Sequence, residues 1–403
     1  MGKEGDQPIS ELPASTFTPL PEKLLKLTLD PPSRPGFVGN LGRYEILKLI
    51  GHGGMRLVLL ARDAETGALR NRWSKSQDAR GSRRDVRDGL VAIKMIRPEL
   101  ASEPRVVRRF IKEARHRERL SHPNILDVLD IAEGPPCPYF VMPYVERGSL
   151  ATLIQRGRML DRERALVIAR QIASAVAHAH SKGIIHRDLK PSNVLVDLET
   201  RAYLSDFGLA RTLFNDSFID VRLHDCEGTA PYLSPALASG EAEDTRCDIY
   251  AFGALLYEML TGHPPFEAET TQANLRLIRA GPPRPIPELN PEAPRELVAV
   301  ADTAMARELR DRYARMSDMA KDLECIANRE KPSIASGLSN GRAKQLQSKA
   351  PLKAVLAGMA AVLILGAIPV ANRLYRGGST DVQRFREVRD IALPGVWQWS
   401  QAE

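Results

Sequence analysis

The segment His186–Asn193, "HRDLKPSN", places a carboxylate and a carboxamide five residues apart. The apolar pair Ile184–Ile185 precedes it, and the run "VLV" follows it. Asp188 can accept the proton of a hydroxyl group, and the amide oxygen of Asn193 can bind a divalent cation. This pair therefore suits phosphoryl transfer to a hydroxyl group.

A second acidic motif, "DFG", begins thirteen residues after Asn193 and supplies Asp206 as a further magnesium ligand. Upstream, "VAIK" puts Lys94 at the end of an alternating strand, where its ammonium group can reach phosphate oxygens. The helix "PRVVRRFIKEARHRERL" carries Glu113 at the edge of its apolar stripe. A carboxylate in that place is costly unless it is paired, and Lys94 is the natural partner.

The stretch "LIGHGGMRLVLLA" has the form of a nucleotide loop, G-x-G-x-x-G-x-V, with Gly51, Gly53 and Val58 in place. Arg56 stands at the third glycine position. Its side chain can turn toward anionic phosphates or toward solvent, and we expect solvent because charged strand residues usually face water. Arginine adopts strand dihedrals, so we expect the hairpin to form and to bind nucleotide with altered affinity.

The elements that must position these residues change in type along the chain. Strand-like runs come first: "YEILKLI", "RLVLLA", "LVAIKMI" and "YFVMPYV". Helical patterns follow, with "DRERALVIARQIASAVAHAH" ending at Gly183 and "DIYAFGALLYEML" ending at Gly262. Strands followed by helices predict an α+β fold of two lobes.

Taken together and in this order, the glycine loop, VAIK, the helix glutamate, HRDLKPSN, DFG and DIYAFG closely resemble the eukaryotic-like (Hanks-type) serine/threonine protein kinases, particularly the membrane-anchored bacterial ones. The resemblance covers residues 43–328. It implies a bilobal protein-kinase fold with a β-rich N-lobe and a helical C-lobe. It also implies ATP with Mg²⁺, or Mn²⁺ as an alternative, and transfer of the γ-phosphate to protein Ser/Thr hydroxyls, including those of the kinase itself.

The resemblance assigns catalytic roles to individual residues. Asp188 is implied to be the catalytic base and Lys190 to contact the γ-phosphate. Lys94, held by Glu113, is implied to bind the α- and β-phosphates. The implied magnesium ligands are Asn193 and Asp206.

The resemblance also implies an ATP pocket around a hinge, Pro143–Tyr144–Val145, with Met142 as gatekeeper. Proline replaces the usual hinge glutamate but keeps the carbonyl that adenine needs, and the N–H of Val145 remains. The implied ATP-binding residues are Ile50, Gly51, Gly53, Val58, Ala92, Lys94, Met142, Pro143 and Val145.

Structural and regulatory roles follow from the same resemblance. Asp248 is implied to brace the catalytic-loop backbone, and Thr229 to contact the catalytic aspartate. Arg187 is implied to pair with a phosphorylated activation loop. The expected phosphosites are Ser217, the first choice, and Thr212.

One departure from the family concerns "GTAPYLSPA", whose last residue, Ala236, stands where the family has a glutamate. That glutamate normally pairs with a late arginine, here Arg312, and breaking such a buried pair costs about 3–5 kcal/mol. We expect Arg312 to have lost this partner, with Asp311 or Asp244 as substitutes. Together with Arg56, the departure keeps open the alternative of a membrane-tethered pseudokinase scaffold that binds ATP without efficient transfer.

Composition excludes some functions. The net charge is +7 over 403 residues, and no basic stripe is interleaved with aromatic residues, so we expect no nucleic-acid partner. The four cysteines have no metal-like or paired spacing, which is typical of a reducing compartment. A small-molecule phosphotransferase is disfavoured because "GTAPYLSP" suits an extended peptide.

The segment Ala354–Asn372 holds 19 residues without a charge. As a helix it would extend roughly 28 Å, close to the thickness of a bilayer core. A buried soluble helix is the alternative, but such helices usually have a polar face, and this segment has none. We expect a single-pass protein of the cell membrane with a cytoplasmic kinase domain, because ATP is cytosolic. The spacing Ala354-xxx-Gly358 permits a homodimer.

The expected domain organisation is as follows: a disordered tail over 1–42, a kinase domain over 43–328 (N-lobe 43–142, C-lobe 146–328), a juxtamembrane linker over 329–353, a transmembrane helix over 354–372 and a short extracytoplasmic tail over 373–403. A basic insertion, residues 70–88, interrupts the N-lobe. It has almost nothing apolar to bury, so we interpret it as a solvated loop in preference to a site for an anionic partner.

Overall fold

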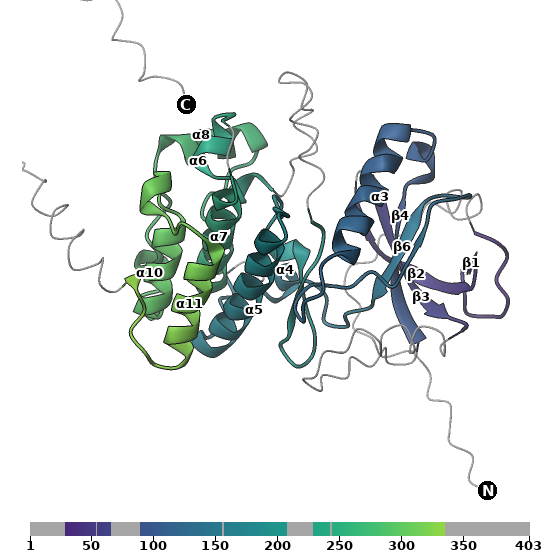
Figure 1. Cartoon of the computed structure of the whole chain (residues 1–403), viewed down its shortest axis with the longest axis horizontal. Coiled ribbons are helices and arrows are strands. Elements are labelled where there is room, and N and C mark those ends of the chain that lie inside the picture. Colours follow the sequence, from purple (N-terminus) through teal and green to yellow (C-terminus); the bar gives the residue numbers. More distant parts are fainter. Residues whose placement is uncertain are drawn as a thin grey trace, which may run out of the picture. The chain divides into compact units, whose positions relative to one another are not determined.

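The computed structural model describes residues 29–53, 55–65, 89–154, 157–207, 229–241 and 244–334. All of them belong to one compact unit, Met1–Ala335. Within this unit, a lobe built on a sheet is followed along the chain by a lobe of helices (Figure 1). The α+β fold of two lobes predicted from the order of strands and helices is confirmed.

The first lobe contains a six-stranded antiparallel sheet of order β1-β2-β3-β4-β6-β5. Four of its strands are the predicted runs; β1 and β5 have three residues each, too few to show an alternating pattern. The strands are β1 (Gly39–Leu41), β2 (Tyr44–His52), β3 (Arg56–Asp63), β4 (Leu90–Ile96), β5 (Asp130–Ala132) and β6 (Tyr139–Pro143). The helix α3 (Pro104–Glu118) follows β4 and begins with a proline, which suits a first helical position.

Alternation along β3 sends its side chains to two different clusters. Leu57 and Leu59 pack with Tyr44 into the cluster on one face of the sheet. Val58 packs into the cluster on the other face, together with Phe110 of α3. The face that α3 covers is therefore the face that carries Val58.

The second lobe consists mainly of helices around α5 and α7. Its helices are α4 (Leu150–Leu153), α5 (Arg162–Ser181), α6 (Pro235–Ala238), α7 (Arg246–Thr261), α8 (Thr271–Ala280), α9 (Ile286–Leu289), α10 (Arg295–Ala304) and α11 (Met316–Ala327). Four 3₁₀ turns and a two-stranded sheet complete the described elements: η2 (Pro98–Leu100), η3 (Pro191–Asn193), η6 (Ala230–Tyr232), η7 (Leu309–Asp311), β7 (Val194–Val196) and β8 (Ala202–Leu204). Gly262 ends α7 in the left-handed conformation, with φ of 73°, as its position after the apolar run predicts.

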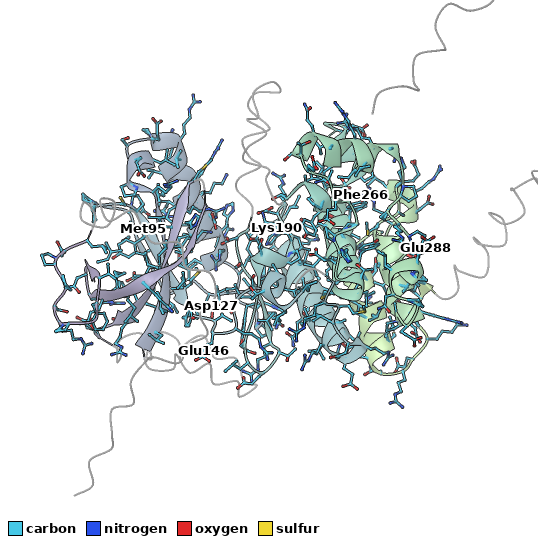
Figure 2. The ribbon with its side chains drawn as sticks, turned by 180° about the vertical axis from the view of Figure 1, so that it is seen from behind. Met95, Asp127, Glu146, Lys190, Phe266 and Glu288 are labelled. Atoms are coloured by element: carbon cyan, nitrogen blue, oxygen red, sulfur yellow. The ribbon has the colours of Figure 1, made fainter. Side chains whose placement is uncertain are left out.

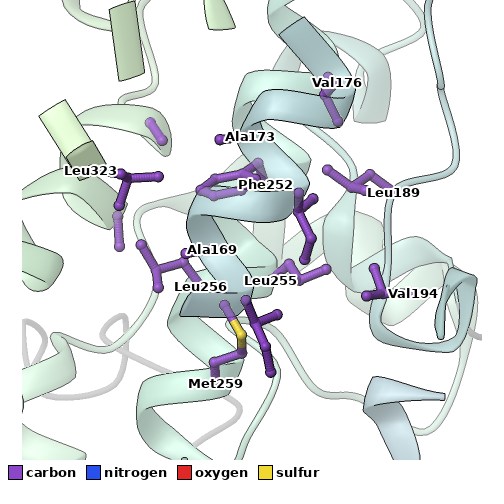
Figure 3. Packing of buried hydrophobic residues seen from close by; sticks show 14 of the residues in the cluster. Ala169, Ala173, Val176, Leu189, Val194, Phe252, Leu255, Leu256, Met259 and Leu323 are labelled. Atoms are coloured by element: carbon purple, nitrogen blue, oxygen red, sulfur yellow. The ribbon is translucent and has the colours of Figure 1, made fainter. Parts of the chain in front are cut away.

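The core of the second lobe joins α5 to α7. Small side chains on α5, such as Ala169 and Ala173, and large ones on α7, such as Phe252 and Leu256, belong to the same buried cluster (Figure 3). Alanines on one helix allow the neighbouring helix to approach closely, so bulky residues of the other fill the space. This packing fixes α7, which carries Asp248 near its N-terminus.

Residues 29–42 are part of the first lobe, so the folded region begins earlier than the predicted boundary at residue 43. The backbones of Asp30 and Asn40 exchange two hydrogen bonds of 2.9 Å. Leu29 packs against the sheet cluster, and a Cβ added to Gly39 would lie 2.8 Å from its Cβ. Arg34 binds the carboxylate of Glu45, with 3.0 Å between Nε and Oε1. These contacts join segments separated in sequence, and local composition, rich in proline, does not reveal them.

The folded region also ends later than residue 328. Asp322, which is 2% exposed, accepts hydrogen bonds from the hydroxyl of Tyr313 at 3.0 Å and from the backbone N–H of Ser333 at 2.6 Å. Ile334 packs against the helical core. The first residues of the predicted linker are thus held by a buried carboxylate.

Several predicted segments lie outside the described residues. They are the insertion 70–88, the apolar segment Ala354–Asn372 and the final tail 373–403. Among the helices that the structure does describe, none has the length and apolar character needed to cross a membrane.

Candidate active site

Strand β4 and helix α3 bring Lys94 and Glu113 together, as their types and spacing predict. Nζ of Lys94 lies 2.8 Å from Oε1 of Glu113, and the two residues are 2% and 5% exposed. The same ammonium group also contacts Oδ1 of Asp206, which comes from the second lobe. One buried cation therefore links the sheet, the helix and the DFG segment.

Asp206 keeps its negative charge in this position. Burial favours its protonated form, but the positive charges of Lys94, Arg56 and Arg117 outweigh burial and hold its pKa well below the usual range. Its backbone has φ of 53°, a left-handed conformation that non-glycine residues seldom adopt outside functional sites. The carboxylate is thus ionised and placed by a constrained backbone.

Arg56 turns into the site, so the expectation that it faces solvent is wrong. Its Nη1 lies 3.4 Å and 3.3 Å from the two carboxylate oxygens of Glu113 and 3.9 Å from Oδ2 of Asp206. Its side chain is 32% exposed. Strand alternation explains this direction, because Arg56 lies two residues before Val58 and shares its face of the sheet. The alternation of side chains along β3 is the sequence signal that would have predicted the direction of the Arg56 side chain.

Three predicted residues of the catalytic loop, His186–Asn193, meet a fourth, Thr229, from the start of η6. Thr229 donates a hydrogen bond to Oδ1 of Asp188 at 3.0 Å, and Nζ of Lys190 lies 3.2 Å from the same oxygen. Lys190 also donates to the hydroxyl of Thr229 at 2.6 Å. The amide of Asn193 donates to the other carboxylate oxygen of Asp188 at 2.8 Å and to its backbone carbonyl at 2.7 Å. In Figure 2, Lys190 lies at the side of the helical lobe nearest the sheet lobe.

Asp248 braces this loop from α7. Its fully buried carboxylate accepts hydrogen bonds from the backbone N–H of His186 at 2.8 Å and of Arg187 at 2.7 Å, and it pairs with Nε2 of His180 at 2.8 Å. Arg187 has φ of 65°, again left-handed. The backbone strain at Arg187 is therefore compensated by hydrogen bonds to one carboxylate.

His186 has both ring nitrogens engaged in structural bonds. Nε2 lies 2.9 Å from the carbonyl oxygen of Ser205, to which it can only donate, and Nδ1 accepts from the backbone N–H of Asp188 at 3.2 Å. The ring centroid lies 4.7 Å from that of Phe207. Both ring nitrogens of His186 are therefore occupied by backbone groups, which gives this side chain a structural role.

Five of the predicted ATP-binding residues share one apolar cluster: Ile50, Val58, Ala92, Met142 and Val145. Leu195 of the second lobe packs against the same cluster, and sequence reasoning missed it. Its strand neighbours Val194 and Val196 are buried in the helical core, so alternation sends Leu195 to the opposite face. Because "VLV" is apolar throughout, the sequence shows no alternation there that could have identified Leu195.

The glycine loop forms the expected hairpin between β2 and β3. Gly51 is the register partner of Val58, and the N–H of Gly53 donates to the carbonyl of Arg56 at 2.9 Å. On the next strands, Ala92 is the register partner of Met142, and Pro143 is the last residue of β6. The predicted hinge thus follows directly from the strand that lies beside Lys94.

Arg312 is well bonded despite the missing family glutamate. Its Nε donates to the carbonyl of Ala306 at 2.6 Å and its Nη2 to that of Arg307 at 3.2 Å. The guanidinium also lies 5.0 Å from the ring centroid of Tyr250. Asp244, one of the expected substitutes, pairs with Arg246 over 2.9 Å. Backbone carbonyls and an aromatic face therefore stabilise the buried cation.

Some predicted residues cannot be placed. Thr212 and Ser217 lie within 208–228, outside the described residues, and so does any phosphorylated partner of Arg187 in that segment. Gly54 of the loop and Gly208 of the DFG motif are likewise outside them.

The side chains of Asn193 and Asp206 fit a magnesium ion. Both supply hard oxygen donors, and the backbone N–H of Ser205 donates to the carbonyl of Asn193 at 2.9 Å, which holds the two segments side by side. Among the described residues, no group of three or more His, Cys, Asp or Glu side chains could enclose a metal ion. Mg²⁺ is commonly coordinated by a few protein oxygens, with phosphate oxygens of the substrate as further ligands.

A match to a known family identifies the kind of protein to which this site belongs. The model of the protein kinase domain matches residues 79–327, more than half of the chain. The chain belongs to the protein kinase family. The match begins after the glycine loop, but β2 pairs with β3 and β3 pairs with β4 in a single sheet, so the loop is part of the same kinase lobe.

Curated relatives of this kinase come from several bacteria. It is 35% identical to the serine/threonine-protein kinase PrkC of Bacillus subtilis over 284 residues, which is 70% of this chain and 40% of that protein. It is 36% identical to a probable serine/threonine-protein kinase PknB of Lactococcus lactis over 282 residues, 70% of this chain and 41% of that protein. It is 32% identical to PknB of Mycobacterium tuberculosis over 312 residues, 76% and 46% of the two chains. The chain thus spans less than half the length of these relatives.

Proposed function

We propose that this chain is a serine/threonine protein kinase that transfers the γ-phosphate of ATP to hydroxyl groups of proteins. The observation that carries the proposal is the joint placement of Asp188, Lys190 and Thr229 beside an intact Lys94–Glu113 pair. The relatives, all named as serine/threonine-protein kinases, support the class of acceptor. The identity of Lys190 supports it as well, because lysine at this place resembles Ser/Thr kinases more than Tyr kinases.

The chemistry follows from the charges in place. Asp188 accepts the proton of the acceptor hydroxyl while that oxygen forms its bond to the γ-phosphorus and the bond to the leaving ADP oxygen breaks. Lys190, 3.2 Å from Oδ1 of Asp188, offsets the negative charge on the transferred group. Lys94 binds the remaining phosphates, held in position by Glu113. Mg²⁺ or Mn²⁺, held by Asn193 and Asp206, would supply further charge neutralisation.

The apolar cluster of Ile50, Val58, Ala92, Met142 and Val145 provides a surface for the adenine ring. We expect the carbonyl of Pro143 and the N–H of Val145 to bind the polar edge of the adenine ring. Adenine recognition by one carbonyl and one N–H needs no side chain at the hinge, so proline at residue 143 is compatible with ATP.

Regulation by autophosphorylation of Ser217, or of Thr212, is part of the proposal. A phosphate in that segment would pair with Arg187, whose backbone is fixed by Asp248. Mass spectrometry of active protein tests this. Phosphate at neither Ser217 nor Thr212 would reject it.

Membrane attachment is proposed from the uncharged segment Ala354–Asn372 alone. The kinase domain would be cytoplasmic, and single-pass attachment would place residues 373–403 on the other side of the membrane. The Ala354-xxx-Gly358 spacing would permit a homodimer. Carbonate extraction of membranes from cells that express the full chain tests attachment. Recovery of the chain in the carbonate-soluble fraction would reject it.

The decisive experiment for activity measures phosphate transfer from labelled ATP and Mg²⁺, by the full chain in detergent, to itself and to a generic basic protein. Asp188→Asn should abolish transfer while preserving the fold, because an amide is nearly isosteric with the carboxylate. Asp311→Asn, at an exposed position, is the matched control and should retain transfer.

The alternative is a membrane-tethered pseudokinase scaffold. The observation that favours it is the contact of Arg56 with Glu113 and near Asp206, which places an extra cation beside the two carboxylates that bind Lys94. No transfer by the wild-type chain, with ATP still raising its melting temperature, would establish the scaffold and reject the kinase activity.

A further inference from the structure

The ion-pair network around Lys94 brings three cations together. Lys94, Arg56 and Arg117 are the cations, and Glu113 and Asp206 are the carboxylates. Arg117 is only 1% exposed and its Nη2 donates to a backbone carbonyl at 3.0 Å; the negative charge of Asp127 also acts on Arg117, and that of Asp188 on Arg56. This cluster therefore places three cations where a polyanionic substrate would bind.

Arg56 is the loosely held member of this network. Glu113 lies 2.8 Å from Nζ of Lys94 but 3.3 Å from Nη1 of Arg56, and Asp206 is 3.9 Å from Arg56. Hydrogen bonds beyond 3.2 Å are at the weak end of the range. When Arg56 moves away, Lys94 remains a close partner of both carboxylates, so neither negative charge is left unpaired.

The position of Arg56 suits a phosphate contact. It is the first residue of β3, directly after the hairpin that Gly53 closes, and its register partner is Ile96, two residues beyond Lys94. Its guanidinium reaches the same two carboxylates as the ammonium of Lys94. A guanidinium presents several donors in a fork that matches phosphate oxygens, which an ammonium group does not.

We propose that Arg56 is a triphosphate-binding residue of this kinase: it rests against Glu113 and Asp206 without nucleotide and transfers its hydrogen bonds to the phosphates of ATP when ATP binds. The proposal rests on the proposed function for the identity of the substrate. If Arg56 binds phosphates, the residue at the third glycine position determines how tightly this chain binds nucleotides. It also determines how well the chain distinguishes nucleotides that carry different numbers of phosphates.

The test measures equilibrium binding of a non-hydrolysable ATP analogue and of adenosine to the full chain by calorimetry. Arg56→Met should weaken binding of the analogue about tenfold or more and leave adenosine within about twofold, as expected for the loss of a charge-assisted hydrogen bond. Arg56→Lys should fall between, because it keeps the charge but loses the fork. Arg62→Met is the matched control: it removes the same charge from β3 at a residue that lies over Phe37 instead of the site, and it should bind both ligands as the wild type does.

Repeating the titrations without divalent cation separates a phosphate contact from an effect through the metal ligand Asp206. The loss specific to the analogue should persist there. The proposal would be overturned if the loss of analogue affinity disappeared without metal, or if Arg56→Met weakened binding of the analogue and of adenosine equally. Tighter binding of the analogue by Arg56→Met would overturn it as well.

The same measurements keep this inference distinct from the proposed activity. An analogue-specific loss in Arg56→Met, with a wild-type chain that transfers no phosphate, would reject the kinase activity and retain the phosphate contact. Active transfer with unchanged analogue binding in Arg56→Met would retain the activity and reject the contact.

Discussion

The hydroxyl group of Thr229 donates a hydrogen bond of 3.0 Å to Oδ1 of Asp188. The same hydroxyl accepts a hydrogen bond of 2.6 Å from Lys190. Thr229 thus joins the proposed base to the proposed phosphate-binding lysine, although it lies 41 positions after Asp188 in the chain. Its position at the start of η6 also connects both residues to the segment expected to dock the substrate.

Replacing Thr229 by valine should slow phosphate transfer without weakening ATP binding. Valine keeps the shape but removes the hydroxyl, so Asp188 and Lys190 lose their common partner and their geometry loosens. A misplacement of reacting groups costs up to about a hundredfold in rate. Steady-state kinetics should show the loss in kcat, with the dissociation constant of ATP unchanged. Thr229→Ser, which restores the hydroxyl, should recover most of the rate; equal losses in both variants would contradict this role.

Replacing Asp248 by asparagine should destabilise the fold as well as slow the reaction. The carboxylate accepts hydrogen bonds from the N–H groups of His186 and Arg187 and pairs with His180. In asparagine, the NH₂ group would face at least one of these N–H groups and could not accept its hydrogen bond. Leaving one such buried N–H unsatisfied costs about 1–3 kcal/mol. Urea unfolding of the variant should show a loss of this size. Asp318→Asn, in the first turn of α11, is the comparison and should change stability by less than about 0.5 kcal/mol.

The buried pair of Tyr232 and Glu258 predicts a pH dependence of stability. The hydroxyl of Tyr232 donates to Oε2 of Glu258 at 2.6 Å, and burial raises the pKa of Glu258 above its ordinary value of 4.5 even though this hydrogen bond lowers it. The folded state therefore holds a proton at Glu258 that the unfolded state has released, in the interval between the two pKa values. The free energy of unfolding contributed by this group is fully present below pH 4.5 and is lost as the pH rises through the raised pKa.

Glu258→Gln removes this titration, so its free energy of unfolding should fall less than that of the wild type as the pH rises from 4.5. Chemical denaturation at a series of pH values measures both slopes. Glu324→Gln, at an exposed residue of α11 that pairs with Arg170, controls for the loss of a surface carboxylate. Parallel slopes for Glu258→Gln and the wild type would refute the prediction.

Arg312 should contribute to stability through its backbone partners. Arg312→Met removes the donors to the carbonyls of Ala306 and Arg307 and the cation over Tyr250. We expect the free energy of unfolding to fall by about 2 kcal/mol, because buried carbonyls lose charge-assisted hydrogen bonds. Arg310→Met, two residues away and exposed, is the control and should have little effect in the same thermal or urea unfolding measurement.

How far the sequence predicts the fold depends on the length of each element. The runs that became β2, β3, β4 and β6 have five to nine residues in the structure and show a clear alternation or apolar content. The three-residue strands β1, β5, β7 and β8 give no such pattern, because they form only where a partner strand supplies the hydrogen bonds.

The sequence by itself determined the types and order of the groups proposed to take part in the reaction. Lys94, Glu113, Asp188, Asn193 and Asp206 were identified because each stands in a short motif whose chemistry and local conformation are set by its neighbours. The helix ends at Gly183 and Gly262 were determined in the same way, since a left-handed glycine stops a helix locally.

Only the tertiary structure decided which groups meet. The contact of Lys94 with Asp206 joins residues 112 positions apart, and the turn of Arg56 toward Glu113 spans 57. The docking of residues 29–42 and the carbonyl partners of Arg312 likewise depend on segments brought together by the packing of distant elements. A charged side chain settles where the folded chain offers the best partner, and that partner is fixed by the whole sheet and core, so no local pattern of residues could specify it.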